Sequence, residues 1–250
     1  MTAIAEFIRG HSPKCPSHLA EDAVHVWAAS LDVNRDAVTN LASILSDAER
    51  ERAVAFKFEH LRNRFVVCRG LLRVLLGGYL KCAPGQIEFV YSERGKPGLS
   101  PASDARSLEF NVSHSDGMAL LAFTRLGAVG VDIERLRAMK DPEGLVTRFF
   151  SAREREQFQT VASEERQSAF FNLWTRKEAW LKATGLGIAG ELNKVEVTFL
   201  PQEPVQFFGV PAGHGTAQEW SLFDLRPAAE YVGALAIQSR DVQLQCWMAD

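Results

Sequence analysis

The first half of the chain alternates apolar and polar residues in patterns that predict one strand followed by two helices. Residues 23–29 (AVHVWAA) form a short apolar run that is typical of a strand. Residues 45–58 have Ser46 near their start and Glu49 three positions later, the capping-box pattern that opens a helix. Residues 61–80 carry an apolar stripe at helical spacing and predict a long second helix.

Strand patterns follow these two helices. Period-two alternation and turn residues predict strands at 86–93 and 108–115, a Gly/Pro turn at 94–99, and a hairpin of two strands within 118–134 that turns at Leu126-Gly127. Residues 1–20 lack either periodicity and are expected to lie loosely on the surface.

The second half repeats this scheme. Residues 151–162 begin at Ser151 with Glu154 in the capping-box position, and residues 166–185 form a long helical pattern that ends at Gly185. Four strand candidates follow, at 194–200, 220–225, 231–238 and 242–248.

The repeated order of elements predicts an α+β protein built from two similar α/β halves. We place the halves at residues 1–125 and 126–250, with the boundary near 124–128. The similarity is one of element order, because the two halves share no repeated residues that would prove a duplication.

Composition narrows the class of protein. The 250 residues are 46% hydrophobic, which is enough for a large core, and the net charge of −3 does not suggest a partner that is nucleic acid or a membrane surface. No apolar run is long enough to span a bilayer, and the N-terminal sequence lacks the layout of a secretion signal. The four cysteines form no CxxC pair, so we expect free thiols in the cytoplasm.

Two carboxylates interrupt the apolar run VGVDIE at residues 129–134. In a strand, Asp132 and Glu134 point to the same face, opposite to the valines and isoleucine. Two like charges on a half-buried face repel each other unless a cation lies between them. A metal site and a solvated strand face both explain this pattern.

The long helix within residues 170–188 carries a second group of charges. Lys177 falls inside the apolar arc of this helix, while Glu178 and Lys182 lie on its border, four residues apart. Such a pair is ordinary on a helix surface, but Glu178 is also a candidate third oxygen ligand for a hard cation such as Mg²⁺.

The segments NVSHS (111–115) and RGKPGL (94–99) offer partners for an anion. Ser113 and His114 point to opposite sides of an extended segment, so they are poorly placed as a nucleophile and base. They are either anion donors or ordinary turn residues. Lys96 is either solvated or a partner for a phosphate, and one or two of the helical arginines could meet the same ligand.

Together these segments identify a resemblance. RGKP, FNVSHS, VGVDIERL and LWTRKEAWLKATGLGI occur in the order and at the separations typical of the 4′-phosphopantetheinyl transferases. The chain resembles the larger pseudodimeric (Sfp-type) members over roughly residues 45–240, and residues 174–179 resemble the Trp-x-x-Lys-Glu-Ala subtype. This resemblance implies two α/β halves about a pseudo-twofold axis, with coenzyme A in the cleft between them.

The resemblance also implies a reaction and its residues. Phosphopantetheine is transferred from coenzyme A to a serine of an acyl or peptidyl carrier protein, and 3′,5′-ADP leaves. The carrier could serve fatty-acid, siderophore, peptide or polyketide synthesis. The implied metal ligands for Mg²⁺ are Asp132, Glu134 and Glu178, and the implied catalytic residues are Asp132, Glu178 as base and Lys182 at a phosphate. Implied coenzyme contacts are Arg52, Arg64, Lys96, Ser113, His114 and Lys182.

One position departs from the family pattern. Members often carry a basic residue one helical turn before the position of Arg52, but this chain has Glu49 there, beside Arg50. Either Arg50 substitutes for that contact or the contact is missing.

We expect the carrier to dock partly on residues 145–154, and the chain to act as a monomer. A different Mg²⁺-dependent nucleotide phosphohydrolase, or a silent protein that binds coenzyme A or a carrier, remains an alternative.

Overall fold

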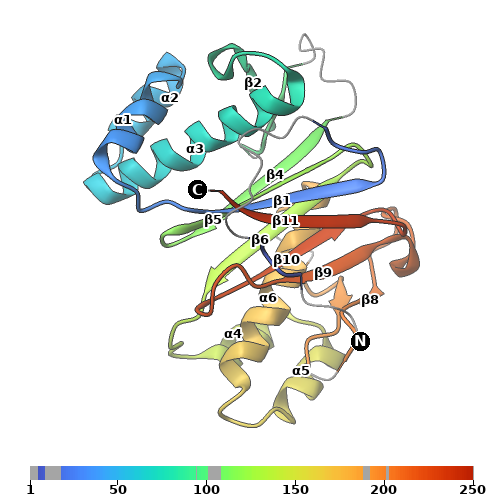
Figure 1. Cartoon of the computed structure of the whole chain (residues 1–250). Helices are drawn as coiled ribbons and strands as arrows, with labels where there is room; N and C mark the ends of the chain where they lie inside the picture. Colours follow the sequence, from blue (N-terminus) through green and yellow to red (C-terminus); the bar gives the residue numbers. More distant parts are fainter. Residues whose placement is uncertain are drawn as a thin grey trace.

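The computed structural model describes residues 5–8, 18–93, 95–100, 108–187, 192–200 and 203–249 (Figure 1). The predicted loose segment 1–20 lies largely outside these residues. The helices are α1 (Arg35–Ser43), α2 (Asp47–Val54), α3 (Glu59–Leu80), α4 (Pro142–Phe149), α5 (Ala152–Gln159) and α6 (Arg166–Thr184), with short 3₁₀ turns at Pro84–Gln86 and Ala217–Glu219. The strands are β1 (Ala23–Ser30), β2 (Phe89–Tyr91), β3 (Pro97–Leu99), β4 (Glu109–Ser115), β5 (Met118–Thr124), β6 (Val129–Arg135), β7 (Glu196–Val197), β8 (Phe207–Gly209), β9 (Ser221–Leu225), β10 (Tyr231–Ile237) and β11 (Gln243–Ala249).

Two sheets form the centre of the molecule. The first has the strand order β11-β1-β5-β4 and the second has the order β6-β10-β9. Their facing sides share a core of small and branched side chains such as Val26, Leu120, Val131 and Leu235. Helix α3 covers the outer side of the first sheet and α6 that of the second, which gives four layers, helix–sheet–sheet–helix (Figure 1). The predicted α+β class is therefore confirmed, and the pseudo-twofold axis stays a prediction.

Local sequence signals account for the helix ends. Both predicted capping boxes are present. The side chains of Ser46 and Ser151 each accept a hydrogen bond from the backbone N–H three residues on, and the glutamate at that position accepts one from the backbone N–H of the serine. Gly185 ends α6 in the left-handed conformation, with φ 73°. Helices α1 and α4 were not predicted, and the Gly/Pro turn at 94–99 contains the short strand β3.

The predicted hairpin within residues 118–134 is wrong. Strand β5 pairs on one side with β1 and on the other with β4, and the tight turn between β4 and β5 lies at Asp116-Gly117. Because both edges of β5 are occupied, β6 crosses to the second sheet and pairs with β10. The apolar pattern could not show this, because β5 and β6 are buried on both faces and their sequences do not encode their partners.

The end of the chain also crosses between the two predicted halves. Strand β11 runs parallel to β1 and forms one edge of the first sheet. Residues 243–249 therefore belong structurally with the first half, so a division at residues 125 and 126 does not separate the two sheets. The segment 5–8 adds a further link, because Ala5 N donates to Asp224 O and Ile8 N donates to Cys246 O, at 3.2 and 3.1 Å.

Helix α6 lies unusually close to β6. A Cβ atom at Gly130 would come within 2.0 Å of the carbonyl oxygen of Ala179 and 2.3 Å of the backbone nitrogen of Ala183. Only glycine permits this approach, because backbone atoms cannot move aside as a flexible side chain can. The contact brings Lys182 of α6 to Asp132 of β6. Among the described residues, no helix is long and apolar enough to cross a membrane.

Candidate active site

The strands β4 and β6 and the helix α6 bring three predicted side chains into one hydrogen-bonded group. Lys182 Nζ lies 2.6 Å from Asp132 Oδ1 and donates to Ser113 Oγ at 2.7 Å. The Ser113 hydroxyl in turn donates to Asp132 Oδ1 at 2.9 Å. Residues that are far apart in the sequence thus meet around a single carboxylate oxygen.

The carboxylates around this group lie in an environment that disfavours their charge. Burial raises the pKa of Glu178 to about 7, and the charges of Asp132 and Glu134 contribute while Lys182 opposes them. Burial also raises the pKa of Glu134, which a hydrogen bond from Ser115 partly offsets. Close carboxylates that are drawn toward their neutral form are the situation that the strand pattern alone had suggested.

Two oxygens in this site have no hydrogen-bond partner. Asp132 Oδ2 and Glu178 Oε1 are both buried and unpaired. Buried polar atoms are nearly always satisfied, so an orphaned pair of carboxylate oxygens points to something that binds there. Hard cations such as Mg²⁺ prefer oxygen ligands of this kind, and the donor set therefore fits such an ion.

The third predicted ligand, Glu134, has less support in the structure than Asp132 and Glu178. Within the described ranges, no three acidic, histidine or cysteine side chains lie close enough to form a ready-made metal site. Glu134 contributes to the field at Glu178, but its Oε2 atom is held by Ser115 Oγ at 2.9 Å. The assignment of Asp132, Glu134 and Glu178 together as ligands stays a prediction.

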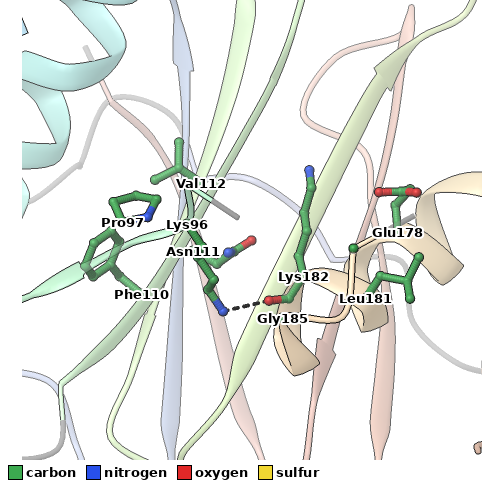
Figure 2. Close-up of a pocket in the computed structure, with 11 residues that line it drawn as sticks. Lys96, Pro97, Phe110, Asn111, Val112, Glu178, Leu181, Lys182 and Gly185 are labelled. Atoms are coloured by element: carbon green, nitrogen blue, oxygen red, sulfur yellow. Dashed lines mark hydrogen bonds between the residues drawn. The ribbon is translucent and has the colours of Figure 1, made fainter. Parts of the chain in front are cut away.

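A cavity of about 290 Å³ opens beside this group (Figure 2). Glu178 and Lys182 line it from α6, while Lys96 lines it from the turn before β3 and Asn111 from β4. Figure 2 shows the Lys96 ammonium directed at the main chain of α6, where it donates to Lys182 O at 2.6 Å. Burial lowers the pKa of Lys96. The cavity therefore has carboxylate oxygens and ammonium groups along its wall, as a ligand with phosphates and a bound cation requires.

Ser113 and His114 lie on opposite faces of β4, as strand alternation predicts. Ser113 is buried against Asp132, whereas His114 is exposed and lines a separate cavity of about 230 Å³ together with Arg64. Arg64 forms a bidentate ion pair with Asp32, and both N–O distances are 2.7 Å. Much of the charge of Arg64 is thus already balanced. The implied roles of Ser113 and His114 as coenzyme contacts stay predictions.

The unusual Glu49 has a structural role. Its side chain is buried, closes the capping box of α2 and accepts from Arg73 Nε at 2.7 Å. Arg50 is held by Asp47 and by the carbonyl of Leu45. These bonds occupy Arg50, so they do not favour it as a substitute for the basic contact that the family pattern leads one to expect.

Arg52 is the basic residue of α2 that lines a cavity. This third cavity has a volume of about 740 Å³ and is also lined by Tyr91 and Gly95. Gly95 lines the 290 Å³ cavity as well, so the two cavities adjoin at the turn before β3.

Lys177 is the one residue of the long helix whose apolar setting the sequence had marked as unusual. It is fully buried, bonds to Glu154 Oε2 at 2.5 Å and donates to the carbonyl of Leu192 at 2.6 Å. Burial lowers the pKa of Lys177. Sequence reasoning assigned no role to this pair or to Asn111 and Ser115, although the alternation of polar residues along NVSHS was a signal for the latter two.

Comparisons with known proteins establish the family. A sequence model of the 4′-phosphopantetheinyl transferase superfamily matches residues 128–236, and one of the N-terminal part of 4′-phosphopantetheinyl transferases matches residues 29–125. The chain belongs to the 4′-phosphopantetheinyl transferases.

Individual relatives agree with this assignment. The chain is 42% identical to the 4′-phosphopantetheinyl transferase HetI of Nostoc sp. over 94% of its length and 96% of the relative. It is 34% identical to a putative 4′-phosphopantetheinyl transferase of Synechocystis sp., over 79% of its length and 77% of the relative. The chain is thus an enzyme that transfers the phosphopantetheinyl group of coenzyme A to carrier proteins. The Trp-x-x-Lys-Glu-Ala subtype stays a prediction.

Proposed function

We propose that the transfer depends on Mg²⁺ and releases 3′,5′-ADP. The observation that carries the proposal is the pair of buried, unpartnered oxygens, Asp132 Oδ2 and Glu178 Oε1, beside the ammonium group of Lys182. We propose Asp132, Glu134 and Glu178 as the residues that hold the cation. When bound, Mg²⁺ would offset the charge on the pyrophosphate of coenzyme A.

The side chains of the site fit the proton and charge movements of this reaction. The carrier serine oxygen forms a bond to the β-phosphorus, and the bond from that phosphorus to the bridging oxygen breaks. The serine proton passes to Glu178, directly or through a water. Lys182 offsets the negative charge that grows on the departing 3′,5′-ADP.

We propose that the nucleotide of coenzyme A occupies the 290 Å³ cavity, with Lys96 beside it. Arg52 lines a cavity that shares Gly95 with this one, which supports it as an outer contact. His114 and Arg64 line a separate cavity, and we propose them as further contacts of the coenzyme. We further propose a monomer in the cytoplasm. The free thiols of Cys68, Cys82 and Cys246 support that location, because a reducing compartment keeps such thiols unpaired.

The test is intact-mass spectrometry of an apo carrier protein after incubation with coenzyme A and this enzyme. With Mg²⁺, the carrier should gain one phosphopantetheine group and an equal amount of 3′,5′-ADP should appear by chromatography. Prior treatment with EDTA should stop both, and added Mg²⁺ should restore both. Transfer at full rate in EDTA would disprove the metal dependence, and release of phosphopantetheine without a carrier would disprove the proposed acceptor.

A further inference from the structure

Strand β4 carries polar side chains at alternate positions along the edge that faces β6. These residues are Asn111, Ser113 and Ser115, and all three are buried. Strand β4 is the edge of the first sheet and β6 is the edge of the second, so the two strands are not paired in one ladder. A sheet edge has free backbone N–H groups that must be satisfied in some other way.

Side chains of β4 satisfy these groups on β6. Asn111 Oδ1 accepts from Val131 N at 3.0 Å, and Ser115 Oγ accepts from Arg135 N at 3.2 Å. These two bonds hold β6 at both ends of the segment that contains the site carboxylates. They therefore fix the position of β6 along β4, as main-chain bonds would in a continuous sheet.

The two serines also hold one oxygen of each carboxylate. Ser113 Oγ donates to Asp132 Oδ1, and Ser115 Oγ donates to Glu134 Oε2, both at 2.9 Å. A carboxylate with one oxygen fixed has its rotation restricted, so its second oxygen is presented in a defined direction. For Asp132, that second oxygen is the buried, unpartnered Oδ2 atom.

Resting on the proposed function, we infer that Ser115 is a positioning residue for cation binding. Its hydroxyl orients Glu134 and anchors the backbone of β6, while Asn111 holds the same strand in register from the other end of the segment. Hydrogen bonds to metal-binding carboxylates commonly change metal affinity by 10- to 100-fold when they are removed. Ser115 touches neither coenzyme nor carrier in this role.

The experiment compares Ser115→Ala with Ser115→Thr, which keeps the hydroxyl. Direct binding of Mn²⁺ to the enzyme without coenzyme A is measured from the loss of the free-ion EPR signal. Transfer to an apo carrier is measured in parallel as a function of Mg²⁺ concentration. The matched control is Ser221→Ala on β9, which belongs to the same sheet as β6. Ser221 Oγ donates to the carbonyl of Ser239 and makes no contact with the carboxylates.

Ser115→Ala should raise the Kd for Mn²⁺ and the half-saturating Mg²⁺ concentration by about 10-fold or more, with a smaller change in kcat at saturating Mg²⁺. Ser115→Thr should restore most of the affinity, and Ser221→Ala should leave it unchanged. If Ser115→Ala does not fold, Ser115→Cys replaces it, because a thiol is only a weak donor.

Two outcomes overturn the inference, and they differ from each other. Wild-type metal affinity in a folded Ser115→Ala enzyme, with wild-type transfer still dependent on Mg²⁺, would remove the role of Ser115 alone. A wild-type enzyme that neither binds Mn²⁺ nor needs Mg²⁺ would remove the proposed metal dependence, and the inference with it.

Discussion

Helix α6 contributes the lysines of two lysine–carboxylate pairs, little more than one turn apart, whose environments differ. Lys177 and Glu154 are 0% and 1% exposed, and both Glu154 oxygens accept hydrogen bonds, from Val197 N and from Ser151 N with Lys177. The Lys182–Asp132 pair is more open and leaves Asp132 Oδ2 without a partner. The first pair is complete within the protein, whereas the second has spare bonding capacity. The first ion pair is thus saturated by the protein, and the second leaves one carboxylate oxygen available to a ligand.

The adjacent residues Lys177 and Glu178 show how one helix serves both purposes. Lys177 points toward α5 and the Phe150 ring, whose centre is 4.9 Å from Nζ. Glu178 lines the 290 Å³ cavity and retains an unpartnered oxygen. Successive positions on a helix point about 100° apart, so two neighbouring residues can reach different surroundings. The Lys177–Glu154 pair thereby holds the helix that also carries Glu178 and Lys182.

The largest expected effect is on stability, at the Lys177–Glu154 pair, which we call the closed pair. Lys177→Met should lower the free energy of unfolding by about 3–5 kcal/mol, because Glu154 would then be a buried charge without its counter-ion. Urea unfolding of the metal-free protein measures this change. The double variant Lys177→Met/Glu154→Gln should recover part of the loss. A single variant within 1 kcal/mol of wild type would show that the pair is not structural.

The Lys182–Asp132 pair, which we call the open pair, should affect activity far more than stability. Asp132→Asn keeps the shape of the side chain but removes its charge, so transfer to an apo carrier should fall by more than about 100-fold, beyond the usual effect of a residue that only supports a metal ligand. Its unfolding free energy should change by less than about 1 kcal/mol, since the carboxylate is incompletely satisfied in the fold. Near wild-type transfer by this variant would overturn the assignment of Asp132, and a large loss of stability would make the two pairs alike.

Sequence reasoning succeeded where the signal was local. The capping boxes at Ser46 and Ser151, and the end of α6 at Gly185, depend on residues a few positions apart, so they could be predicted from spacing. The cluster of Asp132 with Lys182 followed from family motifs rather than from periodicity, and the structure brings the two side chains together.

Partners that are distant in the sequence could not be predicted. The balance of Arg64 by Asp32, and of Glu49 by Arg73, depends on how α3 lies against other elements. The same limitation explains the wrong hairpin and the return of β11 to the first sheet, because strand pairing is decided by which edges are free.

Exposed large apolar side chains in the described chain include Val54, Phe58 and Leu61, and none within 145–154, so the predicted docking segment gains no support from its surface.

A smaller effect is expected where both pairs depend on the position of α6. Gly130→Ala should cost up to about 3 kcal/mol of unfolding free energy, because its new Cβ would press on backbone atoms of α6. The shift of α6 should also reduce transfer, since Glu178 and Lys182 would move away from Asp132. Gly209→Ala on β8 is the matched control, because a Cβ there has no atom within 4 Å. Equal stability of the two variants would contradict the close contact between α6 and β6.

An effect of similar size is a pH dependence of stability at Glu178. In the metal-free enzyme, the folded state raises the pKa of Glu178 from 4.5 to about 7, so the folded state binds its proton more tightly than the unfolded state. This contribution to stability is fully present below pH 4.5 and is lost as the pH rises through 7, with roughly 2–3 kcal/mol of the loss falling between pH 5 and 8. Urea unfolding in EDTA between pH 5 and 8 measures the loss, and Glu178→Gln should flatten it. Added Mg²⁺ should restore stability at pH 8, because a cation favours the ionised carboxylate. An identical pH profile in wild type and Glu178→Gln would show that the unpartnered oxygen imposes no cost, and the contrast with the closed pair would then rest on geometry alone.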